Sequence, residues 1–270
     1  MQKVLFTQEK ETLLITLYAK ALESRWPDSL LRDHLADKAI RQIDYDFSKL
    51  KVTPDKVVGL AMRANVLDQW TRQFLSRNSS ATVLHLGCGL DTRVFRVDPP
   101  PAVQWFDVDY PDVIELRRNL YPNRDHYSMI ASSVTEPDWM LAIPAEQPTM
   151  VIAEGLLPYL SGDDVRCLFQ RLTNHLASGE LAFDACSRFG VRLLKQERSI
   201  KATGASLRWG VDDPKEIEAW SRRIHLIEEK TAYDPAETRR LPWGSRMFLR
   251  LAEFIPPLKR IGRMMRYRFE

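Results

Sequence analysis

The chain has 270 residues, with 39 Lys and Arg against 36 Asp and Glu, so its formal net charge is +3. Apolar residues make up 44% and charged residues 28%, a balance that excludes a disordered chain or a collagen-like fibre. So small a charge does not indicate nucleic acid, and no apolar run approaches the roughly 20 residues that span a bilayer. We therefore expect a globular protein that neither binds nucleic acid nor spans a membrane.

The cysteines and the first residues indicate the compartment. Cys88, Cys167 and Cys186 form an odd set without C-x-x-C spacing, which predicts neither a disulfide framework nor a zinc site. The first ten residues contain no extended apolar run, so no signal peptide is expected. These features predict a cytoplasmic protein without a bound metal.

The first part of the chain, residues 1–76, is predicted to be helical. Apolar residues recur at helical spacing from Leu13 to Leu22, and a second helix is expected over Leu30–Ile43. Thr53-Pro54 opens a third helix, because an N-cap residue is followed there by proline at the first helical position.

Strands and helices then alternate from residue 80 to residue 185. Helices are expected over Asp112–Leu120 and Asp163–Leu176, and strands over Thr82–Leu86, Val103–Val108, Thr149–Ala153 and Glu180–Asp184. This alternation predicts an α/β fold with a parallel sheet covered on both faces. We expect seven strands, the last being an antiparallel edge strand over Arg263–Phe269.

The whole chain is predicted to form one domain in four parts. A helical part (1–76) precedes the ligand-binding core (80–185), a polar and partly helical segment that we interpret as a lid over the substrate (186–242), and the final part of the sheet (243–270).

Two features of the core indicate a bound nucleotide or nucleoside. Gly87 and Gly89 follow the first strand, where glycine allows a tight turn and close approach of a ligand. Asp107 and Asp109 end the second strand, and a carboxylate there accepts hydrogen bonds from ribose hydroxyls. We favour Asp109, which lies nearer the carboxyl end; capping of the next helix is the alternative. Thr92 stands where a dinucleotide fingerprint needs its third glycine.

Two charged residues are expected at the same crevice. Glu154 directly follows the strand that ends at Ala153, and open α/β sheets bind ligands at the carboxyl ends of their strands. Arg63 shares the apolar stripe of its helix with Leu60 and Leu67, where an unpaired cation would be costly. Arg63 is therefore expected to meet an anion, either an internal carboxylate or a ligand.

Three motifs together resemble the leucine carboxyl methyltransferase family, and more closely its bacterial branch of polyketide O-methyltransferases. They are Leu86-Gly-Cys-Gly-Leu-Asp-Thr-Arg93, Val108-Asp-Tyr-Pro111 and Ala153-Glu-Gly-Leu-Leu-Pro-Tyr159. The resemblance covers roughly residues 12 to 190. It implies the fold of a class I methyltransferase, a Rossmann-like sheet with extra N-terminal helices, and S-adenosylmethionine as the cofactor.

The resemblance also implies roles for individual residues. Arg63 would hold the methionine carboxylate of the cofactor, with Lys20 as a second cation, and Glu154 would lie near the same end. Gly87 and Gly89 would border the cofactor and Asp109 would bind its ribose. Ser133 and Val134 would flank the adenine, although many relatives have Asp-Leu at these two positions.

The sequence does not identify a catalytic residue. His85 is interpreted as a core histidine and Cys88 as a packing residue rather than a nucleophile. A carboxylate acceptor needs no general base, whereas a phenol would profit from one. The leading hypothesis is an O-methyltransferase that acts on a small-molecule carboxylate or phenolic hydroxyl. The alternatives are a nicotinamide-dependent oxidoreductase and a catalytically idle binding protein with the same fold.

The segment after the fourth expected strand is basic at its start. The basic residues are Arg188, Arg192, Lys195, Arg198, Lys201 and Arg208, against the single acid Glu197. One interpretation is a face that attracts an anionic acceptor or an acceptor tethered to an acidic carrier protein. The other is a solvated helix face balanced by nearby acids such as Asp212 and Glu216.

Overall fold

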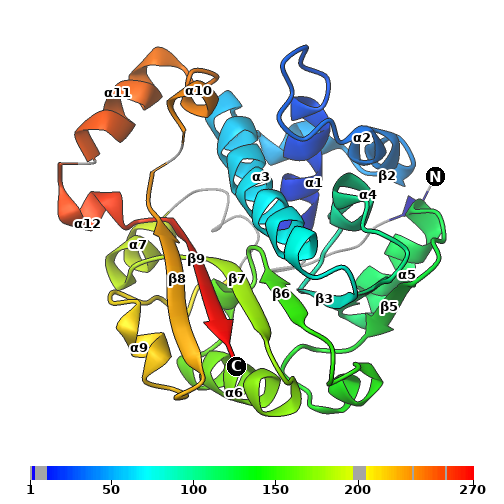
Figure 1. Cartoon of the computed structure of the whole chain (residues 1–270). Coiled ribbons are helices and arrows are strands. Elements are labelled where there is room, and N and C mark those ends of the chain that lie inside the picture. The colour runs from blue at the N-terminus through cyan, green and yellow to red at the C-terminus, as the bar shows by residue number, and fades with distance from the viewer. Residues whose placement is uncertain (1, 4–10, 197–204, 233, 253) are drawn as a thin grey trace.

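A seven-stranded sheet forms the centre of the computed structural model, which describes residues 2–3, 11–196, 205–232, 234–252 and 254–270 (Figure 1). The strand order is β5-β4-β3-β6-β7-β9-β8. Strand β9 is antiparallel to both of its neighbours, and the other pairings are parallel. The strands are β3 (Ala81–Leu86), β4 (Val103–Asp109), β5 (Tyr127–Ala131), β6 (Thr149–Ala153), β7 (Gly179–Ala185), β8 (Ile224–Lys230) and β9 (Arg263–Phe269).

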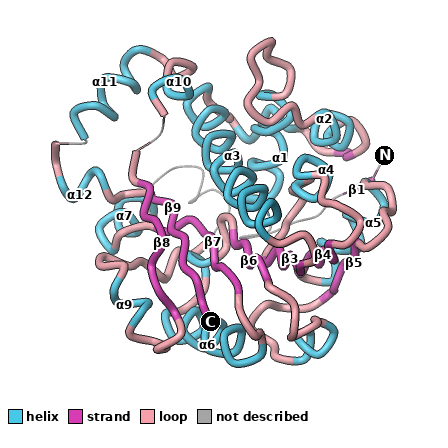
Figure 2. Tube along the Cα trace, viewed as in Figure 1, coloured by secondary structure: helices cyan, strands magenta, loops and turns pink. Residues whose placement is uncertain are grey.

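Helices cover both faces of this sheet (Figure 2). The helices are α1 (Glu11–Glu23), α2 (His34–Ile40), α3 (Pro54–Arg77), α4 (Arg93–Val97), α5 (Pro111–Leu120), α6 (Gly162–His175), α7 (Arg188–Leu194), α9 (Lys215–Glu218), α10 (Pro235–Thr238), α11 (Trp243–Ala252) and α12 (Pro256–Lys259). Short strands β1 (Gln2–Lys3) and β2 (Ile43–Asp44) pair with each other beside α2. In the described residues, no helix is long and apolar enough to cross a membrane.

The central strands are buried on both faces, as their apolar sequences predict. Alternate residues of β3 point to opposite sides: Val83 packs in the cluster that includes Trp70 and Phe74 of α3, and Leu84 packs in the cluster that includes Phe169 of α6. Strand β6 alternates in the same way. The expected parallel sheet with helices on both faces and an antiparallel last strand is therefore confirmed.

The order of the strands places a crevice between β3 and β6. After β3 the chain proceeds outward through β4 and β5, and then returns to β6 on the other side of β3. Loops that leave the carboxyl ends of β3 and β6 therefore diverge in opposite directions. Such a switch point is where open α/β sheets bind their ligands.

The structure corrects three local expectations. The second helix begins at His34 rather than at Leu30, because Arg32 has a positive φ of 51° and the Asp33 carboxylate caps the helix by accepting the Ala36 N–H. Strand β9 is an interior strand rather than the edge strand. The edge strand is β8, which the polar composition of residues 224–230 did not indicate.

Strand β8 lies inside the segment 186–242 that we interpret as a lid, so part of that segment belongs to the sheet. The segment 243–270 contributes α11 and α12 before β9. The division into a helical part, a core, a lid and a final part remains a prediction.

A substitution at Tyr267 tests the interior position of β9. The buried ring stacks on Phe183 with centroids 5.8 Å apart, and its hydroxyl donates to the Pro214 carbonyl at 3.0 Å. We expect Tyr267→Ala to lower the free energy of unfolding in urea by about 3–5 kcal/mol and Tyr267→Phe by about 1 kcal/mol. A loss of about 1 kcal/mol or less for the alanine variant would contradict the burial of this strand.

Candidate functional site

Two adjoining cavities form a crevice at the carboxyl ends of β3 and β6. Their volumes are about 210 and 440 Å³. Both are lined by Gly87 of the loop after β3 and Gly155 of the loop after β6, together with Thr12, Leu13 and Tyr159. The crevice therefore lies where the strand order reverses, and its larger half has the volume of a typical small-molecule site.

The glycine loop turns sharply beneath this crevice. Gly87 and Gly89 have φ values of +58° and +51°, in the left-handed region that favours glycine. A Cβ atom on Gly87 would lie 2.8 Å from the Leu156 side chain, and one on Gly89 would lie 2.7 Å from Leu13. Both glycines border the crevice as predicted, and the two leucines cover the loop.

Asp109 lies at the end of β4 and lines the larger cavity. Its carboxylate accepts the N–H groups of Gly89 and Tyr110, each at 2.7 Å. Burial raises the pKa of Asp109 despite these two hydrogen bonds. The side chain thus couples β4 to the glycine loop and lies beside the cavity. Its contact with a ribose stays a prediction.

Ser133 and Val134 differ in their environment. Ser133 lines the larger cavity, and its Oγ lies 2.8 Å from Thr135 Oγ1. Val134 packs in the core, and its carbonyl accepts the Trp139 indole N–H at 3.4 Å. Only the Ser133 side chain therefore faces the predicted adenine position.

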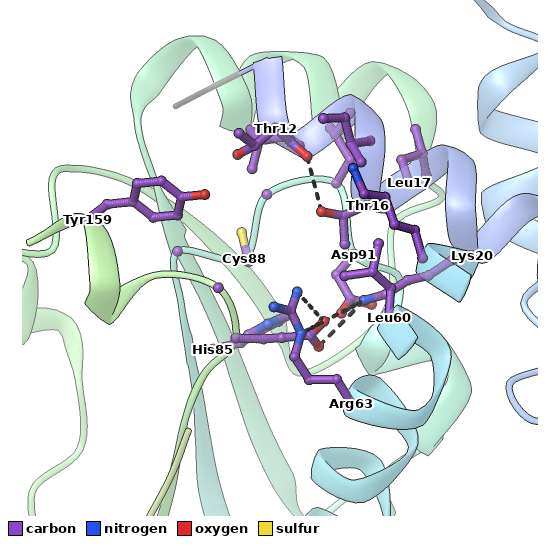
Figure 3. Close-up of a pocket in the computed structure, with 18 residues that line it drawn as sticks. Thr12, Thr16, Leu17, Lys20, Leu60, Arg63, His85, Cys88, Asp91 and Tyr159 are labelled. Atoms are coloured by element: carbon purple, nitrogen blue, oxygen red, sulfur yellow. Dashed lines mark hydrogen bonds and ion pairs between the residues drawn. The ribbon is translucent and has the colours of Figure 1, made fainter. Parts of the chain in front are cut away.

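The smaller cavity contains a cluster of charges (Figure 3). Lys20 of α1 donates to Asp91 at 2.7 Å and to Glu154 at 3.2 Å. Arg63 of α3 lies 3.1 Å from Glu154 and 3.1 Å from Asp184. The three predicted residues Lys20, Arg63 and Glu154 are therefore brought together. Arg63 meets internal carboxylates, one of its two expected kinds of partner, and it also lines the crevice.

Further buried charges extend this cluster beneath the glycine loop. Arg93 contacts Asp68 at 2.7 Å and also pairs with Asp91 and Glu154. Arg96 pairs with Asp33 at 2.8 Å and with Asp68 at 2.9 Å. We call the nine residues the charge cluster: cations Lys20, Arg63, Arg93 and Arg96, and acids Asp33, Asp68, Asp91, Glu154 and Asp184.

The cations of the charge cluster keep its acids ionised. Burial alone would raise the pKa of Glu154, but Lys20, Arg63 and Arg93 outweigh burial and hold this pKa well below its usual range. Burial likewise opposes ionisation of Asp91, whose pKa is nevertheless far below normal because of Arg96, Lys20 and Arg93. Near neutral pH these carboxylates are therefore anionic.

Asp107, the alternative to Asp109, has a structural role. Its carboxylate binds Arg117 and accepts the Tyr127 hydroxyl at 2.6 Å and the Trp105 indole N–H at 2.9 Å. Burial would raise its pKa, but Arg117, the adjacent His85 ring and the Tyr127 hydroxyl lower it to about 2. Asp107 is thus occupied by protein groups.

His85 and Cys88 line the smaller cavity but are buried. Burial and the adjacent Arg93 lower the pKa of His85, against the opposing effect of Asp107. Burial raises the pKa of the Cys88 thiol well above normal. These shifts accord with the interpretation of His85 as a core histidine and of Cys88 as a packing residue.

The basic start of the expected lid is partly neutralised. Arg188 pairs with Asp212 at 3.1 Å and also with Glu216, all three being solvent-accessible. For Arg188, these ion pairs favour the interpretation as a solvated helix face over that as a face that attracts an anionic acceptor. Arg192 and Lys195 are exposed, and Glu197, Arg198 and Lys201 lie outside the described residues.

The sequence did not predict six of the nine residues of the charge cluster: Asp33, Asp68, Asp91, Arg93, Arg96 and Asp184. Asp91 and Arg93 lie within the motif Leu86–Arg93, but the motif alone assigns no role to either. Asp68 follows Leu67 on the buried side of α3. Like Arg63, it is therefore a charged residue among apolar ones, which is a signal that the sequence contains. Asp33 and Asp184 carry no such signal, because their partners are distant in the sequence.

The crevice offers complementary groups for S-adenosylmethionine. Asp109 and Ser133 present oxygens beside the larger cavity, and Arg63 and Lys20 present cations beside the smaller one. The glycine loop connects the two cavities. Gly87 lines both of them. These residues fit a molecule with a nucleoside at one end and an amino-acid carboxylate at the other.

Known proteins with similar sequences are methyltransferases. The leucine carboxyl methyltransferase family model matches residues 13–173. The chain is 40% identical to the tetracenomycin polyketide synthesis O-methyltransferase TcmP of Streptomyces glaucescens, over 99% of both chains. It is 32% identical to the S-adenosyl-L-methionine-dependent methyltransferase dpfgK of Gibberella zeae, over 99% of this chain and 97% of the relative.

Solved structures show the same fold at low identity. A DUF574 family protein from Streptomyces avermitilis has a TM-score of 0.64 at 14% identity and covers 98% of both chains. The plantazolicin methyltransferase BamL, in complex with a triazolic desmethylPZN analog and SAH, has a TM-score of 0.53 at 14% identity, over 97% of this chain and 99% of that one.

Glu154→Gln tests the energetic role of the charge cluster. Because the variant leaves buried cations short of a counter-charge, we expect it to lower the free energy of unfolding at pH 7 by about 3 kcal/mol. The pKa of Glu154 is lower in the folded protein than its value near 4.5 in the unfolded chain. Ionised Glu154 therefore stabilises the fold above pH 4.5, and this stabilisation declines as the pH falls below 4.5. The difference should therefore shrink by up to about 1.4 kcal/mol per pH unit below 4.5.

Urea unfolding of both proteins between pH 7 and pH 3.5 measures this difference. Glu115→Gln, at an exposed position on α5, is the control and should change stability by less than about 0.5 kcal/mol. A difference between wild type and Glu154→Gln that does not vary with pH would contradict the ionised state of Glu154.

Proposed function

Since the chain belongs to the leucine carboxyl methyltransferase family and is an S-adenosylmethionine-dependent methyltransferase, we propose that it methylates an oxygen of a small molecule. The acceptor oxygen belongs to a carboxylate or a phenolic hydroxyl. The similarity to an O-methyltransferase of polyketide synthesis over nearly the whole chain supports this proposal. Secondary metabolism is then the setting, and three unpaired cysteines accord with a cytoplasmic location.

The residues of the crevice would hold the cofactor at its two ends. When bound, S-adenosylmethionine supplies an electrophilic methyl group. Asp109 would accept hydrogen bonds from the ribose, and Ser133 would border the adenine. Arg63, with Lys20, would bind the carboxylate of the methionine end, and Glu154 would keep both cations in place. Leu13 and Leu156 would exclude water over the glycine loop, which methyl transfer requires.

The state of Asp184 supports a carboxylate rather than a phenol as the acceptor. This carboxylate lines a further cavity, which shares Arg63 with the crevice. It pairs with Arg63 at 3.1 Å and accepts the Gly155 N–H at 2.5 Å. An acid so engaged is a poor general base. A carboxylate acceptor, which is already ionised at neutral pH, is therefore favoured over a phenol.

A transfer assay tests this function directly. The protein would be incubated with methyl-labelled S-adenosylmethionine and a panel of carboxylic acids and phenols. We expect labelled products that release methanol in alkali, because methyl esters hydrolyse there and aryl methyl ethers do not. Alkali-stable products would favour the phenol. Binding of S-adenosylhomocysteine without transfer to any acceptor would favour the idle binding protein, and binding of NAD alone would favour the oxidoreductase.

Arg63→Ala and Asp109→Ala test the assigned cofactor contacts. Each variant removes one charge-assisted contact, worth about 1.5–3 kcal/mol, so the affinity for S-adenosylhomocysteine should fall roughly 10- to 150-fold. Calorimetry measures the affinity, and Glu115→Ala on the exposed side of α5 is the control. Unchanged affinity in both variants would contradict the assignment. Unfolding of Arg63→Ala would show that this arginine is mainly a structural ion-pair partner.

A further inference from the structure

A third cavity, of about 620 Å³, opens beside the two that form the crevice. One wall consists of the end of β7 and the start of β9, and the other consists of α10, α11 and α12. Figure 1 shows these three helices beyond the β8 end of the sheet, with α10 beside the beginning of α3. Arg63 lines both this cavity and the crevice. An acceptor in the cavity would therefore adjoin the cofactor site.

The cavity carries an excess of positive charge. Among its described lining residues Asp184 is the single acid, and Arg63 already neutralises it. Arg263 is likewise neutralised by Glu229 at 2.5 Å. Within the described part of the chain, four further cations of the lining form no ion pair: Arg239, Arg246, Arg250 and Lys259.

Arg246 is the most informative of these cations. Its Nε atom is shielded from solvent and has no hydrogen-bond partner among the described residues. A buried donor without an acceptor costs about 1–3 kcal/mol, and more when the group is charged. Because Arg246 lines the cavity, an anion there would supply its guanidinium with the counter-charge that the described residues do not provide. Arg239, at the end of α10, lines the same cavity and would add a second guanidinium.

The remaining wall suits the carbon skeleton of the same ligand. Apolar side chains line the cavity beside the cations: Phe248, Leu249, Ala252, Leu258, Ile261 and Met264. Cavities of roughly 300–1,000 Å³ with a few placed polar groups hold drug-sized molecules. The lining thus combines apolar side chains with cations that form no ion pair among the described residues.

The reaction itself indicates which anion these cations bind. Transfer of a methyl group to an oxygen anion removes the charge of that anion in the transition state. Cations that hold the reacting oxygen would stabilise the ground state more than the transition state and would slow transfer. Arg239 and Arg246 do not line the crevice where the methyl group would lie. They are therefore suited to an anion that does not react.

We propose that the cavity binds the acceptor through an anionic group separate from the oxygen that is methylated, with Arg239 and Arg246 as the specificity-determining residues. The acceptor is then an acid with a second nucleophilic oxygen: a dicarboxylate, or a carboxylate that also bears a phenol. This inference rests on the proposed function. It adds that the methylated product retains a negative charge.

Calorimetry on the full chain saturated with S-adenosylhomocysteine tests the anion site. The probes are benzoate, 2-naphthoate and anthracene-2-carboxylate, each paired with its neutral amide. We expect at least one acid to bind 10-fold or more tightly than its amide. Arg239→Gln and Arg246→Gln should each weaken that acid about 10-fold and leave the amide unchanged. Arg246→Lys, which keeps the charge, should lose less affinity than Arg246→Gln.

Arg166→Gln, at an exposed position on α6, is the matched control and should bind all probes as the wild type does. Acids that bind no better than their amides, or no binding by any acid, would overturn the inference. So would wild-type affinity in both arginine variants. Failure of S-adenosylhomocysteine itself to bind would instead count against the proposed function.

A second titration separates the proposed anion from the reacting oxygen. S-Adenosylhomocysteine is replaced by sinefungin, in which a carbon replaces the sulfur and bears a protonated amine where the transferred methyl group would be. An anion held by Arg239 and Arg246 away from the methyl position should bind with an affinity that changes less than about twofold. Binding that becomes 10-fold tighter with sinefungin would place the anion against the methyl group and overturn the inference.

Discussion

The charge cluster is the constraint on which the rest of the structure depends. It connects α1, α3, the loop after β3 and the loop after β6 through side chains that are almost entirely buried. Taking such charges out of water costs several kcal/mol per ion, so each needs its partner at contact distance. The N-terminal helices can therefore pack on the sheet only where Lys20 and Arg63 reach Glu154. This requirement closes the crevice on the side that faces α1 and α3.

The same charges connect the crevice with the cavity of about 620 Å³ beside α10, α11 and α12. Arg63 contacts Glu154 at the end of β6 and Asp184 in β7, two neighbouring strands of the sheet. Asp184 also fixes Gly155 through its backbone N–H. A ligand carboxylate that approaches Arg63 would meet a guanidinium that protein acids already hold in position. The arginine is thereby preorganised between the two spaces in which cofactor and acceptor are proposed to bind.

The sequence predicted the parts of the fold that depend on local pattern. Apolar strands such as Thr149–Ala153 and the N-cap at Thr53 are local signals, and both match the structure. Strand β8 was missed because its Glu228, Glu229 and Lys230 suit an edge strand, where charged side chains reach water. Asp33 and Asp184 were missed, as was the cavity lined by Arg239 and Arg246, since these features arise only when distant segments meet. Arg63 was predicted because its burial could be read from one helix.

Ionisation at the crevice also matches a reaction that moves a methyl group and no proton. Asp91 and Glu154 have pKa values below their usual range, because cations outweigh the effect of burial. Burial raises the pKa of Cys88 and Tyr159 and lowers that of His85. General acid–base catalysis would need the opposite, a group tuned toward the working pH. Burial raises the pKa of Asp109, but this carboxylate is engaged by two backbone N–H groups. The crevice thus orients charges and excludes water, as methyl transfer requires.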